Sequence, residues 1–214
     1  HIAIVGGKRV RIRLADDLRE ERSHSVSLSA DLYHTFGKVQ TNLLVEGFYT
    51  ILDDVFALRD MDDAADGGKV KERYNGSGAT VRGFNVEGRA AFTRWFELQA
   101  GVTLQQSRYK EPEFWSEDAE VPPVRRMFRT PDTYGYFTAS FKPVRNFTAD
   151  LSGTCTGSML VQHMAGSGVA QDVAVSTPSF FDMNIRLSYD VRIYKEITMQ
   201  LYGGVQNLFN AYQK

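Results

Sequence analysis

Apolar and polar side chains alternate along much of this chain, most plainly over residues 24–36. The even-numbered positions of that stretch are mostly apolar and the odd-numbered ones polar, as in Val26, Leu28, Ala30 and Leu32 against Ser25, Ser27, Ser29 and Asp31. Because successive side chains of a β-strand point to opposite faces, this pattern predicts a strand with one apolar and one wet face.

The same rhythm recurs eight times, which predicts eight long strands at 24–36, 39–58, 79–92, 95–109, 134–142, 146–160, 179–191 and 196–209. Short turns are expected at 37–38, 93–95, 143–145 and 192–195, and long polar loops at 59–78, 110–133 and 161–178. The charged part of residues 1–23 is expected to be a surface loop. Alternating short and long connections between such strands are typical of a transmembrane β-barrel wall. We therefore expect an all-β, antiparallel up-and-down meander.

Composition excludes several other classes of protein. The net charge of -1 gives no electrostatic basis for binding nucleic acid. No stretch approaches the roughly 18 to 20 apolar residues that a membrane helix needs. Cys155 is the only cysteine, so the chain forms no internal disulfide.

The polar faces of the expected strands carry many charges: Asp31, Glu46, Glu87, Arg89, Glu97, Asp150, Asp182, Arg186 and Asp190. Burying them in a tight eight-stranded core would be costly unless all were paired. A wide, wet or plugged lumen tolerates them. The eight strands are therefore expected to form one arc of a larger barrel.

Three short segments resemble signatures of TonB-dependent outer-membrane receptors. Residues 15–23 are similar to the segment before a late barrel strand, residues 83–88 to a strand motif, and residues 204–210, with the sequence GVQNLFN, to the motif near the family's C-terminus. The three occur in the family's order and spacing, and the resemblance extends over nearly the whole chain. The sequence is most similar to receptors of the Bacteroidetes group and, within that group, to its cobalamin and ferric-chelate receptors.

The resemblance implies a 22-stranded barrel of the outer membrane around an N-terminal plug. Residues 1–214 would then be a C-terminal portion of that barrel, roughly the fourteenth to the twenty-first strand, without the plug domain and the last strand. The implied function is active import of a scarce large nutrient such as a ferric siderophore, haem or cobalamin-type complex. The implied partners are TonB–ExbB–ExbD, reached through the plug, and the lipid or lipopolysaccharide around the barrel. No cofactor is implied, and whether a surface lipoprotein covers the barrel stays open.

The family's orientation places the short turns in the periplasm and the long loops outside, where substrate is captured. The 110–133 loop combines aromatic side chains, which offer contact area, with arginines, which pair with carboxylates or phosphates. The predicted substrate-binding residues are Tyr109, Phe114, Trp115, Arg125, Arg126, Arg129 and His163. The arginines have an alternative role, in binding lipopolysaccharide phosphates or pairing with nearby glutamates.

The sequence shows no pattern of an enzyme or of a metal site. Its four histidines lack zinc-site spacing, and neither GxSxG nor a P-loop occurs. Cys155 falls on the apolar register, as a small apolar residue does. Asp62, Asp63 and Asp66 lack the EF-hand pattern, so a solvated acidic loop is favoured over a calcium site.

Two other functions remain open at this point. One is a passive porin or an adhesion barrel, which a plug-like domain encoded upstream would exclude. The other is a soluble β-rich binding module, in which Phe96, Leu98, Ala100, Val102 and Leu104 would pack in a core.

Overall fold

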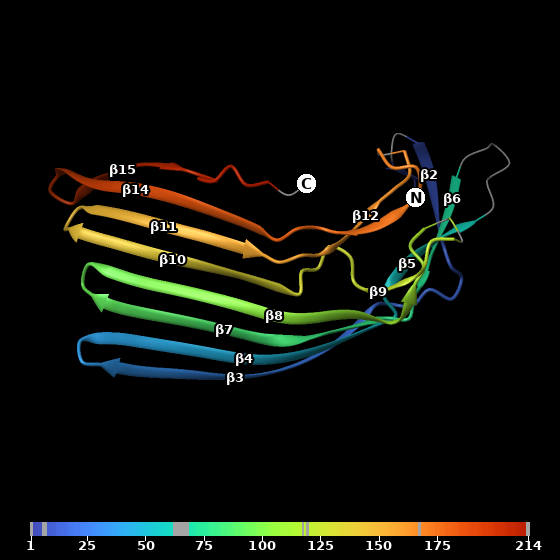
Figure 1. The fold of residues 1–214 in the computed structure, drawn as a ribbon, viewed down its shortest axis with the longest axis horizontal. Coiled ribbons are helices and arrows are strands. Elements are labelled where there is room, and N and C mark those ends of the chain that lie inside the picture. The colour runs from blue at the N-terminus through green and yellow to red at the C-terminus, as the bar shows by residue number, and fades with distance from the viewer. Residues whose placement is uncertain are drawn as a thin grey trace.

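A computed structural model describes residues 2–5, 8–61, 69–116, 118, 120–166 and 168–212. Eight long antiparallel strands lie side by side in chain order (Figure 1): β3 (Arg22–Phe36), β4 (Val39–Asp53), β7 (Ala79–Thr93), β8 (Phe96–Glu113), β10 (Thr133–Val144), β11 (Phe147–Thr156), β14 (Phe180–Tyr194) and β15 (Ile197–Val205). A short strand, β9 (Val124–Arg126), pairs with β8. The expected all-β meander is confirmed.

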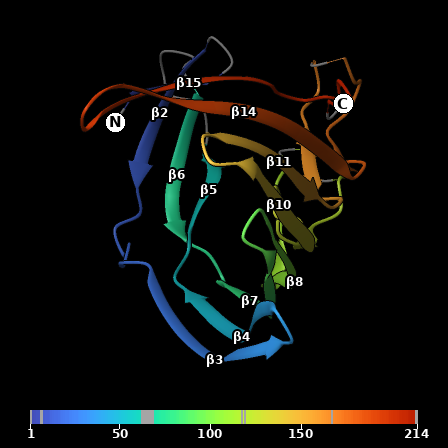
Figure 2. The same cartoon turned by 90° about the vertical axis from the view of Figure 1, so that its left-hand side faces the viewer.

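The sheet is an open arc. Figure 2 looks along the strands and shows them following a curve, with β3 at one end and β15 at the other. Each of these two strands has a hydrogen-bonded neighbour on one side only within the described residues. Exposed edges of long strands invite further pairing. Within the described residues the arc therefore leaves one unpaired strand edge at each end.

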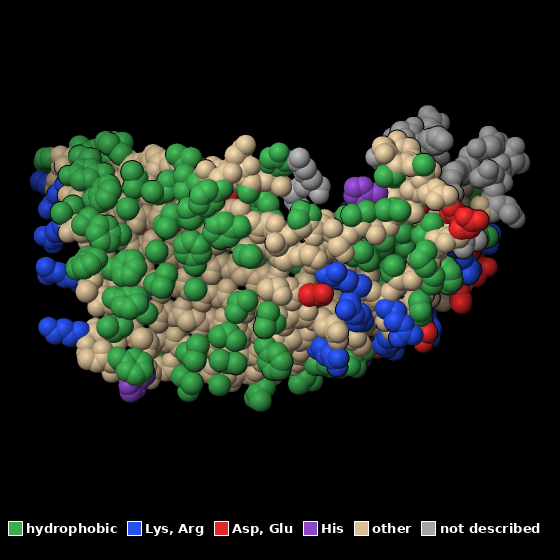
Figure 3. Space-filling view, in the orientation of Figure 1, with side chains coloured by type: hydrophobic (Ala, Val, Ile, Leu, Met, Phe, Trp, Pro, Cys, Tyr) green, Lys and Arg blue, Asp and Glu red, His purple; other side chains and the backbone are tan. Residues whose placement is uncertain are grey.

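The register between strands collects the apolar side chains on one face. Leu28 pairs with Gly47, Gly47 with Phe84, and Phe84 with Leu104, so one row crosses four strands. Leu28 is 82% exposed, Phe84 62% and Leu104 52%. Figure 3 shows hydrophobic side chains spread over this face of the sheet. Exposing such a face to water costs about 25 cal/mol of free energy for each Å² of apolar surface. Contact with hydrocarbon in place of water would remove this cost.

The described residues contain almost no apolar core. The buried hydrophobic residues among them are Ala15 and Ala79, whereas Val102 and Leu104 are 40% and 52% exposed. Within the described residues these strands therefore do not pack in a core, as the alternative of a soluble β-rich module requires. Within the described part of the chain, no helix is long and apolar enough to cross a membrane.

Three strands end earlier than expected. The strand expected to reach residue 58 ends at Asp53, because Asp54 adopts a positive φ of 54° and leaves the ladder. The strand expected to reach residue 160 ends at Thr156, where the pairing with β14 also ends. The last strand ends at Val205, two residues before Asn207, which has a positive φ of 51°. A positive φ is incompatible with a continuing strand.

Segments expected to be loops contain further strands. β1 (Ile2–Val5), β2 (Lys8–Leu14), β6 (Lys69–Asn75) and β5 (Phe56–Met61) form a second sheet in that order, with β2 and β6 parallel. β12 (Leu160–His163) and β13 (Val173–Ser176) form a hairpin. The many charges of residues 8–14 and 69–75 suggested loops, yet a sheet can hold such side chains when they pair: Glu72 is buried and lies opposite Arg59, whose guanidinium it binds. The expectation of a loop in the charged part of 1–23 and in the described part of 59–78 was therefore wrong.

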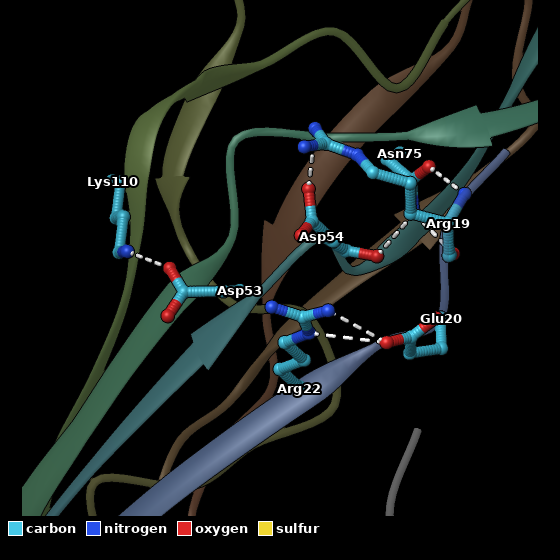
Figure 4. Close-up of polar contacts among 7 residues, drawn as sticks. All are labelled: Arg19, Glu20, Arg22, Asp53, Asp54, Asn75 and Lys110. Atoms are coloured by element: carbon cyan, nitrogen blue, oxygen red, sulfur yellow. Dashed lines mark hydrogen bonds and ion pairs between the residues drawn. The ribbon is translucent and has the colours of Figure 1, made fainter. Parts of the chain in front are cut away.

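A polar junction ties the second sheet to the ends of β3 and β4 (Figure 4). The Asn75 amide donates to the carbonyl oxygens of Asp54 at 2.7 Å and Arg19 at 2.8 Å, and its own oxygen accepts the Arg19 N–H at 2.7 Å. The Arg19 guanidinium also lies 2.9 Å from the Asp54 carboxylate. These contacts satisfy the backbone at the point where the chain turns away from the barrel wall.

The face opposite the apolar one is polar and hydrogen-bonded across strands. The Tyr136 hydroxyl donates to Glu87 at 2.5 Å, and the Gln99 amide donates to Glu87 at 2.9 Å and to the Tyr136 hydroxyl oxygen at 3.1 Å. Gly101 lies opposite Tyr136 in the ladder, and a Cβ at Gly101 would come within 2.7 Å of the tyrosine ring. Glycine at this position therefore lets Tyr136 reach Glu87.

Replacing Gly101 by alanine tests that packing. The Gly101→Ala variant should displace the Tyr136 ring and destabilise the full-length barrel by about 1–3 kcal/mol, the usual cost of overpacking. The measurement is urea unfolding in lipid vesicles. The matched control is Gly88→Ala, because a Cβ at Gly88 meets nothing within 4 Å. Equal unfolding midpoints for the two variants would contradict the expectation.

A half-buried glutamate at the end of β8 should make the junction sensitive to pH. Burial raises the pKa of the Glu113 carboxyl, and burial together with the Glu113 charge raises the pKa of Tyr74 and of Tyr109. A raised pKa means that the folded junction prefers the protonated acid. Its stability should therefore be greatest below the ordinary glutamate pKa and fall as pH rises through the raised value.

Hydrogen exchange of the Gly76 amide, which bonds the Val55 carbonyl at 2.7 Å, measures this effect. Protection corrected for intrinsic exchange should fall across that pH window in the unaltered protein and stay level in Glu113→Gln. Glu111→Gln, at an exposed position two residues away, is the control and should keep the slope. An unchanged slope in Glu113→Gln would refute the assignment.

Candidate functional site

The seven predicted binding residues all lie at the end of the sheet opposite the short turns. Tyr109 is on the last part of β8, Phe114 and Trp115 follow that strand, and Arg125 and Arg126 are on β9. Arg129 lies in the next turn and His163 ends β12. A bridge between Phe128 and Leu160 links the loop that carries β9 to the β12–β13 hairpin.

The two aromatic residues after β8 differ in their packing. The Trp115 ring meets the Phe128 ring edge-on, with the centroids 5.4 Å apart, and its indole N–H is buried without a hydrogen-bond partner among the described residues. Phe114 is 72% exposed. The pair thus offers an indole packed against Phe128 and an exposed phenyl ring, which suits a large, partly apolar ligand.

The adjacent arginines of β9 face opposite sides of the sheet. Arg126 pairs with Arg108 in the ladder, and Arg108 shares the apolar face with Leu104. Arg125 instead lies 3.8 Å from Glu111, with both side chains largely exposed. Of the two, Arg125 is therefore the one available on the side of Tyr109.

Arg126 is held in place by two contacts. Its guanidinium donates to the Ser158 carbonyl at 2.6 Å and lies 3.1 Å from the Asp132 carboxylate. Arg129 contributes its backbone: it has a positive φ of 55°, and its N–H donates to the Leu160 carbonyl at 2.8 Å. Both residues thus connect the 110–133 loop to the chain around residues 158–160.

One carboxylate couples the two long loops further. Asp172 accepts a hydrogen bond from the Ser116 hydroxyl at 2.6 Å and another from the Ala165 N–H at 2.7 Å. The Ser116 bond is the main reason, and the Ala165 bond the second, why the pKa of Asp172 lies below its usual value. Together with the contacts of Arg126 and Arg129, these two bonds make the loops one connected surface.

No metal site emerges from the described residues. His163 is exposed and lies opposite Val173 in the hairpin, and the described residues contain no group of three histidine, cysteine or acidic side chains that could hold a metal ion. Asp62, Asp63 and Asp66 lie outside the described residues. The chemistry at this end is that of aromatic rings and guanidinium groups.

The wall below these loops is acidic and partly hollow. Asp31, Glu46 and Glu87 accept hydrogen bonds from neutral amide or hydroxyl groups, whereas Arg89 pairs with Glu97 at 2.5 Å and Arg186 lies 4.8 Å from the centre of the Tyr202 ring. A hollow of about 860 Å³ is lined by Asp150, Asn184, Arg186 and Tyr202, among others. This face is suited to water or to a polar partner.

Sequence reasoning missed four residues that organise the loops: Phe128, Asp132, Ser158 and Asp172. Phe128 and Asp132 lie in the loop chosen as the best candidate, so the mixture of aromatic and charged residues there pointed toward them. Ser158 acts through its backbone carbonyl, and nothing in its side chain signals that. Asp172 lies in the expected 161–178 loop, which is rich in Gly, Ser and Ala and contains no motif that marks this residue.

A family model for the β-barrel of TonB-dependent receptors matches residues 4–208. Among solved structures, the ferric-catecholate import receptor Fiu from E. coli K12 is similar at 16% identity and a TM-score of 0.61, over 91% of this chain and 24% of that one. The outer-membrane transporter YddB from Escherichia coli is similar at 14% identity and a TM-score of 0.62, over 96% of this chain and 31% of that one.

The ferric enterobactin receptor PfeA from Pseudomonas aeruginosa, in a mutant form, gives 14% identity and a TM-score of 0.55, over 87% of this chain and 26% of that one. Identities this low show a shared fold. No curated protein sequence matches. The chain spans about a quarter to a third of the length of these structures. The match over 4–208, together with the arc of strands and its two contrasting faces, shows that the chain belongs to the TonB-dependent receptor β-barrel family.

Proposed function

We propose that this chain supplies eight late strands to the closed barrel of a TonB-dependent importer in the outer membrane. Members of the family are transporters of the outer membrane and not enzymes. The unpaired edges of β3 and β15 would join further strands, in the manner of the 22-stranded transporters whose lumen holds a plug. We also propose that the full protein has a last strand and an N-terminal plug domain.

The observation that carries the proposal is the contrast between the two faces of one curved sheet. One face exposes Leu28, Phe84 and Leu104, while the other carries hydrogen-bonded carboxylates such as Glu46 and Glu87. Lipid would cover the first face, and an aqueous, plugged passage would solvate the second. A sheet with two wet faces or two apolar faces would not suit a wall between lipid and water.

The proposed process is transport without covalent chemistry. The loops at the Trp115 end face outside and bind a scarce, large nutrient complex, and a plug rearrangement driven by TonB–ExbB–ExbD admits it. The four short turns then face the periplasm. Ferric siderophore, haem and cobalamin-type complexes are the proposed substrates, and a surface lipoprotein that covers the barrel is a further candidate partner. The similarity of the sequence to Bacteroidetes receptors stays a prediction.

Two features support capture of an anionic complex by the loops and not by the wall. Arg125 and the exposed Phe114 ring are available at the loop end. Along the wall, acidic side chains outnumber Arg89 and Arg186. An anion would therefore be held at the loops and repelled by the lumen until the plug moves.

Uptake by cells that carry the full-length gene tests the function. Ferric-catecholate, haem and cobalamin, each radiolabelled, should be compared in cells with and without TonB. Import of one of them that disappears without TonB is the expected result. Uptake of small solutes that persists without TonB would instead identify a passive porin.

The loop assignment has its own test in the same full-length protein. Replacing Trp115 and Arg125 together by alanine should weaken binding of the imported complex by about 10- to 100-fold, because buried aromatic and arginine anchors carry most of the energy of such interfaces. Titration of tryptophan fluorescence or calorimetry measures the affinity.

The matched control replaces an aromatic residue and an arginine at the short-turn end, Tyr194→Ala with Arg145→Ala, both exposed. This variant should bind as the unaltered protein does. Full affinity in the Trp115 and Arg125 variant would remove the loop assignment and leave the family membership untouched.

A further inference from the structure

An unneutralised cluster of arginines lies on the apolar face, just where the apolar band ends. Arg82 pairs with Gln106 in the ladder, and Arg108, two residues further along β8, pairs with Arg126. All three arginines share the face of Phe84 and Leu104. Figure 3 shows lysine and arginine side chains gathered on this face beside the hydrophobic ones, toward the loop end.

Two other cations near this rim have carboxylate partners, whereas two members of the cluster have none among the described residues. Lys110 is bonded to Asp53, and Arg22 lies 2.7 Å from Glu20 (Figure 4). Among the described residues, the partner of Arg82 is the neutral Gln106 amide oxygen, at 2.8 Å. One terminal nitrogen of Arg108 is buried and has no hydrogen-bond partner there.

Arg108 and Arg126 face each other directly across the β8–β9 pair. Directly opposed side chains have Cβ atoms about 4.5–5.5 Å apart and diagonal ones about 7–8 Å, so Arg82 is also within reach, and like charges at such spacing repel. Among the described residues, Asp132 is the one carboxylate that reduces the repulsion, 3.1 Å from Arg126, and the Arg126 Nε is itself buried without a partner there. The cluster thus carries two uncompensated positive charges beside an apolar surface, where unpaired charge is costly.

An open groove adjoins the arginines on the same face. It has a volume of about 760 Å³, and its lining includes Val26, Leu28, Phe84 and Leu104 together with Arg82, Gln106 and Asp132. Gly47 deepens it, since this residue has no side chain and lies between Leu28 and Phe84 in the row across the strands. The groove is apolar along its length and cationic at its loop end.

We propose that this groove binds a lipid whose headgroup is a phosphate monoester, with an acyl chain along Leu28 and Phe84 and the phosphate on Arg82 and Arg108. A monoester carries a charge of about −1.5 to −2 at neutral pH, which matches the two uncompensated charges of the cluster, whereas a phosphodiester carries one. An arginine guanidinium can donate two parallel hydrogen bonds to the oxygens of one phosphate. The phosphate would therefore also give hydrogen-bond partners to the unpaired nitrogens of the cluster. The inference rests on the proposed function only in that this face must meet lipid.

Native mass spectrometry of the full-length protein in detergent tests the proposal, with phosphatidic acid as the monoester probe and phosphatidylglycerol with the same acyl chains as the diester. The unaltered protein should retain phosphatidic acid at least about 10-fold more tightly, and Arg82→Gln with Arg108→Gln should lose about 10- to 100-fold of that affinity, as expected for removed charge-assisted hydrogen bonds. The matched control, Arg94→Gln with Arg145→Gln, removes two arginines at the opposite rim and should retain the lipid normally.

A groove-filling variant separates a lipid from a free anion. Gly47→Leu leaves every charge in place, and the first atom of its side chain has room, since a Cβ there lies 3.5 Å from the Phe84 ring. It should weaken phosphatidic acid binding, whereas it should not change the effect of inorganic phosphate added as a competitor. Lipid affinity unaffected by Gly47→Leu would mean that the arginines hold a phosphate group alone, and the groove would be excluded.

Equal retention of the two lipids, or unchanged retention in the Arg82 and Arg108 variant, would overturn the proposal. Heat-modifiable migration on gels checks in every case that the barrel is closed. A protein without that migration would contradict the proposed barrel, whereas a closed barrel that ignores phosphatidic acid would contradict this inference alone.

Discussion

The backbone ladder is the constraint on which the rest of this structure depends. In hydrocarbon no water is available for N–H and C=O groups, so a wall of strands must satisfy them between neighbours. The same ladder fixes which side chains share a face, because a slip of one residue would move every side chain to the other side. The row from Leu28 through Gly47 and Phe84 to Leu104 and the row from Glu46 through Asn85 to Thr103 are two products of one register.

The polar face is stabilised mainly by neutral donors. Asn85 donates to Glu46 at 2.9 Å, Thr103 donates to Asn85 at 2.8 Å, and Tyr136 and Gln99 converge on Glu87. These bonds order the wall without cancelling its negative charge, so the face keeps a field that arginine pairing would have removed. That property fits a surface that meets water or a polar plug, and it explains why the loop end differs so strongly from the wall below it.

At the loop end, the same alternation places neighbouring residues in different environments. Arg125 and Arg126 are adjacent in sequence, yet one lies near Glu111 and the other beside Asp132 and Arg108 on the apolar side. Under the proposed function, a single three-residue strand would therefore serve both substrate capture and lipid contact. Asp172, Arg126 and the Arg129 backbone connect the two long loops, so the aromatic pair of Trp115 and Phe128 is carried on a coupled surface.

The sequence by itself determined the eight long strands, their two faces and the short connections between them, because the two-residue period is local and each of these strands carries it independently. Gly37, with a positive φ of 63°, marks one of those turns through glycine's own conformational freedom. Only the tertiary structure decided that residues 8–14 and 69–75 form a parallel pair, that Asp54 ends β4, and that Ser116 meets Asp172. Those outcomes depend on contacts between segments dozens of residues apart. The free energy of such contacts cannot be read from a local sequence pattern. The same holds for the arginine cluster, because Arg82, Arg108 and Arg126 become neighbours only when three strands pair in register.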